Sequence, residues 1–83
     1  MYLDLIKKYV NNLKKSDIEI YANKNDIKLD KNELELLYNT IKLRWKDIYI
    51  DGITVINEYK SKLKDSTYNK LIELYNNIKR YYN

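Results

Sequence analysis

The stretch 30–50 constrains the fold of this chain most strongly, because its apolar residues follow a helical period over its whole length. They recur at three- and four-residue steps, which places them on one face of a helix. A second apolar line repeats every seven residues. A helix that is apolar on two faces packs between neighbours, so 30–50 is predicted to be a central helix. The first line is Leu34, Leu37, Tyr38, Ile41, Trp45 and Ile48, and the second is Leu36, Leu43 and Ile50.

The start of this helix is well specified. Asp30 can accept from free backbone N–H groups of the first turn, and Glu33 can reach back to the N–H of Asp30. Together they form a capping box. Leu29 and Leu34 flank the box at the positions of a hydrophobic staple. The sequence therefore predicts a helix that begins at Asp30.

Further helices are predicted on both sides. The ranges 2–14 and 17–24 precede the central helix, the second of them opened by a Ser16–Glu19 capping box. The turn 23–26 follows, where Asn and Asp tolerate left-handed geometry. A helix over 54–63, with Thr54 as a possible cap, and a last helix from Asp65 or Ser66 come after the centre. The fold class is all-α: a compact bundle of four to five short helices in a single domain, 1–83.

One segment supports a second interpretation. Asp51-Gly52 contains the only glycine and stands between β-branched residues, which is a strong hairpin signal. An isolated hairpin is marginally stable, and the chain has no other convincing strand to join it. The favoured prediction is helix, turn and helix, with a small β-hairpin at 47–56 as the alternative.

The composition removes much of the usual chemistry of catalysis. The chain has no His and no Cys, so the commonest general base, the thiol nucleophile and most transition-metal ligands are absent. It also has no glycine-rich phosphate loop. Two frames that approximate a calcium loop, 22–33 and 47–58, lack several ligands. We expect no enzymatic activity, no metal and no cofactor.

The charge pattern leaves nucleic-acid binding open. The formal net charge is +4, and lysines alternate with acids along the chain, as is typical of a solvated surface. Cations beside aromatic rings could still contact phosphates and stack on bases. The candidate contacts for this alternative function are Lys42, Arg44, Lys46, Lys79 and Arg80.

Protein association is the favoured function. Some apolar residues lie off the main helical stripes and exceed what so short a chain is expected to cover, which suits a homo-oligomer or another protein partner. The ten tyrosines, against no phenylalanine, fit either a small core near the surface or a tyrosine-rich binding face. The candidate interaction surface is Leu36, Leu43, Ile50, Leu74 and Tyr81.

The expected compartment is the cytoplasm. Cysteine is absent, no apolar run has the length of a bilayer span, and no signal peptide precedes the first helix. We therefore expect no membrane partner.

Four segments carry a resemblance to a known group of proteins. They are SDIEIYA, IKLDKNELELLYNTIK, RWKD and TYNKLIELY. In these segments the chain resembles short, uncharacterised all-helical proteins of low-GC Gram-positive bacteria, which form a domain of unknown function. The resemblance covers most of the chain as a pattern of caps and apolar positions. It implies an all-helical fold and transfers no activity or site residue.

Overall fold

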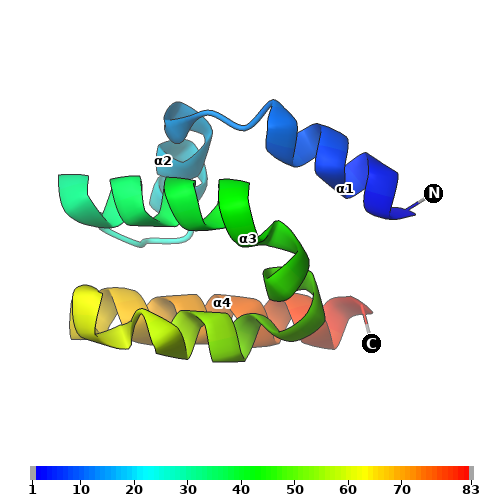
Figure 1. The fold of residues 1–83 in the computed structure, drawn as a ribbon. Coiled ribbons are helices and arrows are strands. Elements are labelled where there is room, and N and C mark those ends of the chain that lie inside the picture. Colours follow the sequence, from blue (N-terminus) through cyan, green and yellow to red (C-terminus); the bar gives the residue numbers. More distant parts are fainter. Residues whose placement is uncertain (1, 83) are drawn as a thin grey trace. The chain divides into compact units, whose positions relative to one another are not determined.

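Helices account for all the regular secondary structure in the described part of the chain (Figure 1). The structure, a computed structural model, describes the backbone of residues 2–82 and the side chains of residues 3–80. The all-α prediction is confirmed, with α3 as the central helix. The elements are α1 (Tyr2–Asn11), α2 (Lys15–Lys24), α3 (Lys31–Glu58), the 3-10 helix η1 (Lys60–Lys62) and α4 (Asp65–Tyr82).

The chain divides into two compact units, Met1–Lys46 and Asp47–Asn83. Helix α3 contributes to both of them. Its first part packs with α1 and α2, and its last part packs with α4 (Figure 1). Each unit buries its own apolar residues, namely Val10, Ala22 and Ile27 in the first unit and Val55 and Leu63 in the second.

The start of α3 is formed by the predicted capping box. The backbone N–H of Glu33 donates to Oδ1 of Asp30 at 2.8 Å, and the N–H of Asp30 donates to Oε1 of Glu33 at 3.1 Å. Two N–H groups that a helix start leaves unpaired are thereby satisfied. Glu33 is almost fully buried, so its carboxylate is held inside the first unit.

Helix α2 starts earlier than predicted. Lys14 precedes its first residue, and the carboxylate of Asp17 accepts from the backbone N–H of Lys14 at 2.9 Å. The predicted box of Ser16 and Glu19 is therefore wrong by two residues. Asp17 reaches the terminal N–H first because it stands three residues after Lys14, the spacing that this bond requires.

The end of α2 is a Schellman motif. Asp26 has a positive φ of 57°, as predicted for this turn. The N–H of Ile27 donates to the carbonyl of Ala22 at 2.8 Å, and the N–H of Asp26 donates to the carbonyl of Asn23 at 3.2 Å. Ala22 and Ile27 are both buried, in agreement with the apolar contact that accompanies this motif.

The prediction that the central helix ends near Ile50 is wrong. Helix α3 continues through Asp51 and Gly52 to Glu58, so neither the hairpin at 47–56 nor a separate helix over 54–63 forms. Packing explains the difference. Val55 is buried, and Gly52 lies so close to Tyr75 of α4 that an added Cβ would stand 2.2 Å from the tyrosine ring. Tertiary burial outweighs the weak local preference for a turn.

The Asp51-Gly52 pair, which suggested a turn, is marked inside α3 by hydrogen bonds from backbone N–H groups to side chains. The N–H of Thr54 donates to Oδ1 of Asp51 at 3.2 Å, and its hydroxyl donates to Oδ2 at 2.7 Å. The N–H of Gly52 donates to the hydroxyl of Tyr75 at 3.1 Å. Backbone donors served by side chains are typical of a helix start, so Asp51 acts as a cap within a continuous helix.

Candidate functional site: a groove on the first helix

The apolar stripe of α1 is wider than the part of it that neighbouring elements cover. Val10 is buried and Ile6 is half-buried, whereas Leu5 and Tyr9 are 68% and 72% exposed. An amphipathic helix of a small protein normally turns its apolar stripe toward the core. Leu5 and Tyr9 instead form an exposed apolar edge on the first unit.

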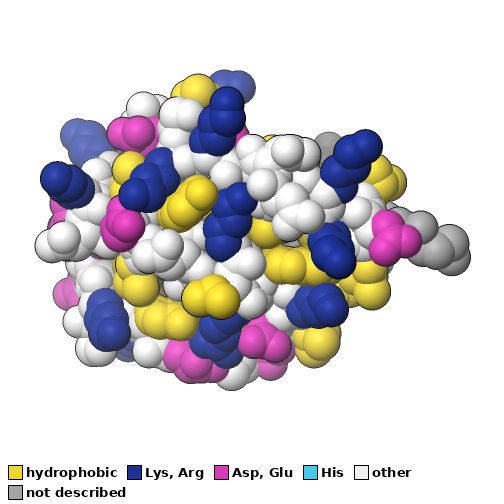
Figure 2. Space-filling model, turned by 45° about the horizontal axis from the view of Figure 1, so that its top comes forward, with side chains coloured by type: hydrophobic (Ala, Val, Ile, Leu, Met, Phe, Trp, Pro, Cys, Tyr) yellow, Lys and Arg dark blue, Asp and Glu magenta, His cyan; other side chains and the backbone are white. Residues whose placement is uncertain are grey.

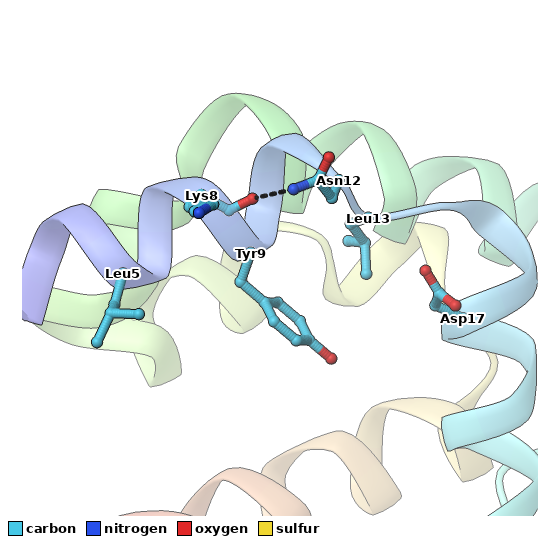
Figure 3. A pocket seen from close by; sticks show the side chains of 6 residues that line it. All are labelled: Leu5, Lys8, Tyr9, Asn12, Leu13 and Asp17. Carbon is cyan, nitrogen blue, oxygen red and sulfur yellow. Dashed lines mark hydrogen bonds between the residues drawn. The ribbon is translucent and has the colours of Figure 1, made fainter.

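This edge borders a groove of about 440 Å³. Leu5 and Tyr9 project from the same side of α1, with Leu13 beyond them and Asp17 of α2 at the far end (Figure 3). The volume lies in the range of pockets that hold small ligands or side chains. The groove is lined by Leu5, Lys8, Tyr9, Asn12, Leu13 and Asp17.

Two hydrogen bonds position the polar residues of the groove. The amide Nδ2 of Asn12 donates to the carbonyl of Lys8 at 3.0 Å, so this side chain serves a terminal carbonyl of α1. Asp17 is held by its bond from the N–H of Lys14. The polar rim is thereby fixed by the local structure. Helix α1 ends at Asn11, short of the predicted 14, and α2 starts at Lys15.

The groove combines an apolar contact area with polar side chains. Its titratable side chains are Lys8, Tyr9 and Asp17, and its other lining residues are apolar or amide. Across the described residues, the structure groups no three acids, histidines or cysteines in a way that could hold a metal ion. An apolar surface with a tyrosine and a polar rim is typical of a protein-binding surface.

The residues predicted for an interaction surface have different environments. Leu43 of the first unit is 83% exposed, and Ile50 of the second is 79% exposed. Leu36 and Leu74 are half-buried. The side chain of Tyr81 lies outside the described residues. These residues are distributed over both units, so the structure does not bring them together within either one.

The predicted nucleic-acid contacts are also divided between the units. In the first unit, Nζ of Lys42 donates to the carbonyl of Asn11 at 2.9 Å and lies 5.6 Å from the ring centre of Tyr38. Lys42 therefore ties α1 to α3. Nζ of Lys46 lies 5.6 Å from the ring centre of Trp45, and Arg44 is half-buried. Lys79 and Arg80 are exposed in the second unit.

Sequence reasoning did not single out Leu5 and Tyr9, because both follow the regular apolar period of the predicted helix 2–14. The width of that stripe was the available signal. Together with Ile6, Val10 and Leu13 they cover more of the helix circumference than one neighbour buries. Which edge stays exposed is decided by how α1 packs on α3.

Comparisons with family models, with curated proteins and with solved structures find no match for this chain. The resemblance to all-helical proteins of Gram-positive bacteria therefore stays an expectation. Among the described residues, none of the helices combines the length and the apolar character needed to cross a membrane.

Proposed function

We propose that this protein is a small non-enzymatic module that binds protein through the groove on α1. One observation carries the proposal: Leu5 and Tyr9 are more than two-thirds exposed and line the same groove. Keeping two large apolar side chains in water forgoes about 1.5–3 kcal/mol for each side chain that burial would gain. A partner that covers the groove recovers part of that free energy.

The tyrosine suits this role. A tyrosine side chain has only two rotatable χ angles, so it offers a large contact area at a low cost in conformational entropy. Its ring can pack on an apolar partner while its hydroxyl stays near water. Tyr9 stands between Leu5 and Leu13 along the groove, so it is the central apolar side chain of the groove (Figure 3).

Nucleic-acid binding receives less support. Lys42 is used to join α1 to α3, and the remaining predicted cations belong to two units. Acidic side chains stand among the lysines over the face drawn in Figure 2. The face drawn in Figure 2 therefore shows no one-sided basic patch of the kind that phosphate binding favours.

The test is chemical crosslinking of the full chain in the cells that express it. We expect crosslinked protein species with the wild type, and their loss with the double variant Leu5→Ser/Tyr9→Ser. Because both side chains are exposed, the free energy of unfolding should change by no more than about 0.5 kcal/mol for each substitution. Circular dichroism and thermal melting check that the variant folds.

Leu43→Ser is the matched control, because Leu43 is an exposed leucine of the same unit that does not line the groove. The control variant should keep the crosslinked species. If the double variant also keeps them, the groove is not the binding site. If Leu43→Ser alone loses them, binding occurs at the surface predicted from the seven-residue repeat.

A further inference from the structure

Two hydrogen bonds in the middle of α3 give its second half a helix start of its own. The N–H of Gly52 donates to the hydroxyl of Tyr75 at 3.1 Å, and the N–H of Thr54 donates to Oδ1 of Asp51 at 3.2 Å. In a regular helix such N–H groups depend on carbonyls four residues earlier, which a break in the helix would remove. Both groups here have side-chain acceptors that such a break would leave in place. The part of α3 from Asp51 onward can therefore stay helical without the part before it.

The stretch around this point holds the helix weakly. All residues of 47–55 are aspartate, glycine, tyrosine or β-branched, and these types have a lower helix propensity than leucine, lysine or glutamate. Between Thr40 and Gly52, no residue that the structure describes is buried, so this stretch adds no buried side chain to either core. The boundary between the two compact units falls between Lys46 and Asp47. The free-energy cost of opening the helix here is therefore low.

We infer that α3 contains a hinge at 47–50, where the helix opens locally while both compact units stay folded. Opening releases the carbonyls of 47–50, which in a regular helix accept from the N–H groups of 51–54. The side chains of Asp51 and Tyr75 keep two of these four donors bonded, so only two must turn to water. The residues that line the groove on α1 lie outside this segment, so the hinge does not depend on the proposed function.

Amide hydrogen exchange of the full wild-type chain, resolved by NMR, measures this opening directly, because local opening costs less free energy than global unfolding. We expect the amides of Asp51 and Ile53 to be at least about tenfold less protected than those of 37–41 in the same helix. The amides of Gly52 and Thr54 should be better protected than those two neighbours, because their side-chain acceptors remain. Equal protection along the whole of α3 would mean that the helix opens only as a unit, and the hinge would be excluded.

Two single variants separate the two side-chain acceptors. Tyr75→Phe removes the hydroxyl and keeps the ring beside Gly52, so it should lower the protection of the Gly52 amide and leave that of Thr54 unchanged. Asp51→Ala removes the carboxylate and should have the opposite pattern. If neither variant changes these two amides, the side chains hold no helix start and the inference fails.

Proline at two matched positions of α3 tests the hinge through stability. Leu43 and Ile50 are 83% and 79% exposed, so neither substitution removes a core side chain. Proline inside a helix removes a donor and clashes with the carbonyl four residues earlier, which lowers the folding equilibrium constant about a hundredfold or more. We expect this loss for Leu43→Pro. Ile50→Pro should cost about tenfold or less, because proline is tolerated at the start of a helix.

Urea unfolding followed by circular dichroism measures both losses, with Leu43→Ala and Ile50→Ala as controls for the removed side chains. Similar losses for the two prolines, or an Ile50→Pro chain that does not fold, would show that α3 is one uninterrupted helix and would overturn the hinge. Neither result affects the crosslinking expected of Leu5→Ser/Tyr9→Ser, so the proposed function stands or fails separately.

Discussion

Asp26 is the residue whose backbone conformation ends α2. A residue with a side chain is disfavoured at a positive φ, although aspartate tolerates it better than most. The conformation persists because it aligns the two closing bonds of the Schellman motif and places Ile27 beside Ala22 in the core. The left-handed conformation of Asp26 therefore determines where the linker to α3 starts.

We expect Asp26→Gly to raise the free energy of unfolding by about 0.5 kcal/mol. Relief of the left-handed conformation is worth ~1–2 kcal/mol. The added freedom of glycine in the unfolded chain offsets ~0.4–1 kcal/mol of that gain. Urea unfolding followed by circular dichroism measures the difference. Lys24→Gly, in the last turn of α2, should instead lower stability by about 1 kcal/mol. An equal loss in both variants would contradict the assigned role of Asp26.

Asp51 is the residue whose protonation affects α3. The hydroxyl of Thr54, then its backbone N–H, lower the pKa of the Asp51 carboxyl below its ordinary value of 3.8. Burial opposes the shift slightly, and the charge of Lys79 adds to it. A lowered folded-state pKa means that the ionised carboxylate stabilises the fold. This contribution is fully present above the unfolded pKa and is lost as the pH falls through the folded pKa.

We therefore expect Thr54→Val to raise the pKa of Asp51 toward 3.8, because it removes the hydrogen bond that contributes most. A carboxyl-carbon NMR titration measures this pKa directly. In thermal melts, wild type and Asp51→Asn should differ by a constant interval above about pH 4 and converge in more acidic solution. An interval that widens on acidification would show that another group controls this segment.

At the scale of elements, α3 and α4 in the second unit form an antiparallel pair. Gly52 of α3 contacts Tyr75 of α4. Further along α3, Oδ1 of Asn57 accepts from the hydroxyl of Tyr68, which lies earlier in α4. The order of these partners runs in opposite directions along the two helices. Gly52 allows the tyrosine ring to approach the α3 backbone, since glycine has no Cβ in its way.

This packing makes Gly52→Ala informative, because two effects have opposite signs. Helix propensity alone favours alanine by about 1 kcal/mol. The new Cβ would meet the ring of Tyr75 at 2.2 Å, and forced repacking costs about 1–3 kcal/mol. It also displaces the hydroxyl that accepts from the N–H of residue 52. We expect a net loss of about 1–2 kcal/mol in urea unfolding.

The background variant Tyr75→Leu provides the control for that experiment. A shorter, flexible side chain leaves room for the added Cβ, so Gly52→Ala should then be neutral or stabilising. If Gly52→Ala stabilises the chain that retains Tyr75, the helix propensity dominates. The close approach of α3 and α4 would then have no energetic consequence.

At the scale of the whole molecule, two compact units share α3, and the groove belongs to the first of them. All six residues that line the groove belong to that unit. Cations and acids are interspersed on the face in Figure 2, with apolar side chains exposed between them.

Local signals in the sequence determined the helical class, the capping box at Asp30, the left-handed turn at 23–26 and, to within a residue or two, the start of the last helix, which was predicted at Asp65 or Ser66 as the cap and has Asp65 as its first residue. Each depends on residues a few positions apart, whose hydrogen bonds and periodicity can be read along the chain. Only the tertiary structure decided that α3 continues past Gly52, because the ring of Tyr75, far along the chain, packs there. It also decided that Leu5 and Tyr9 stay exposed, because packing on α3 selects which edge of a wide apolar stripe is buried.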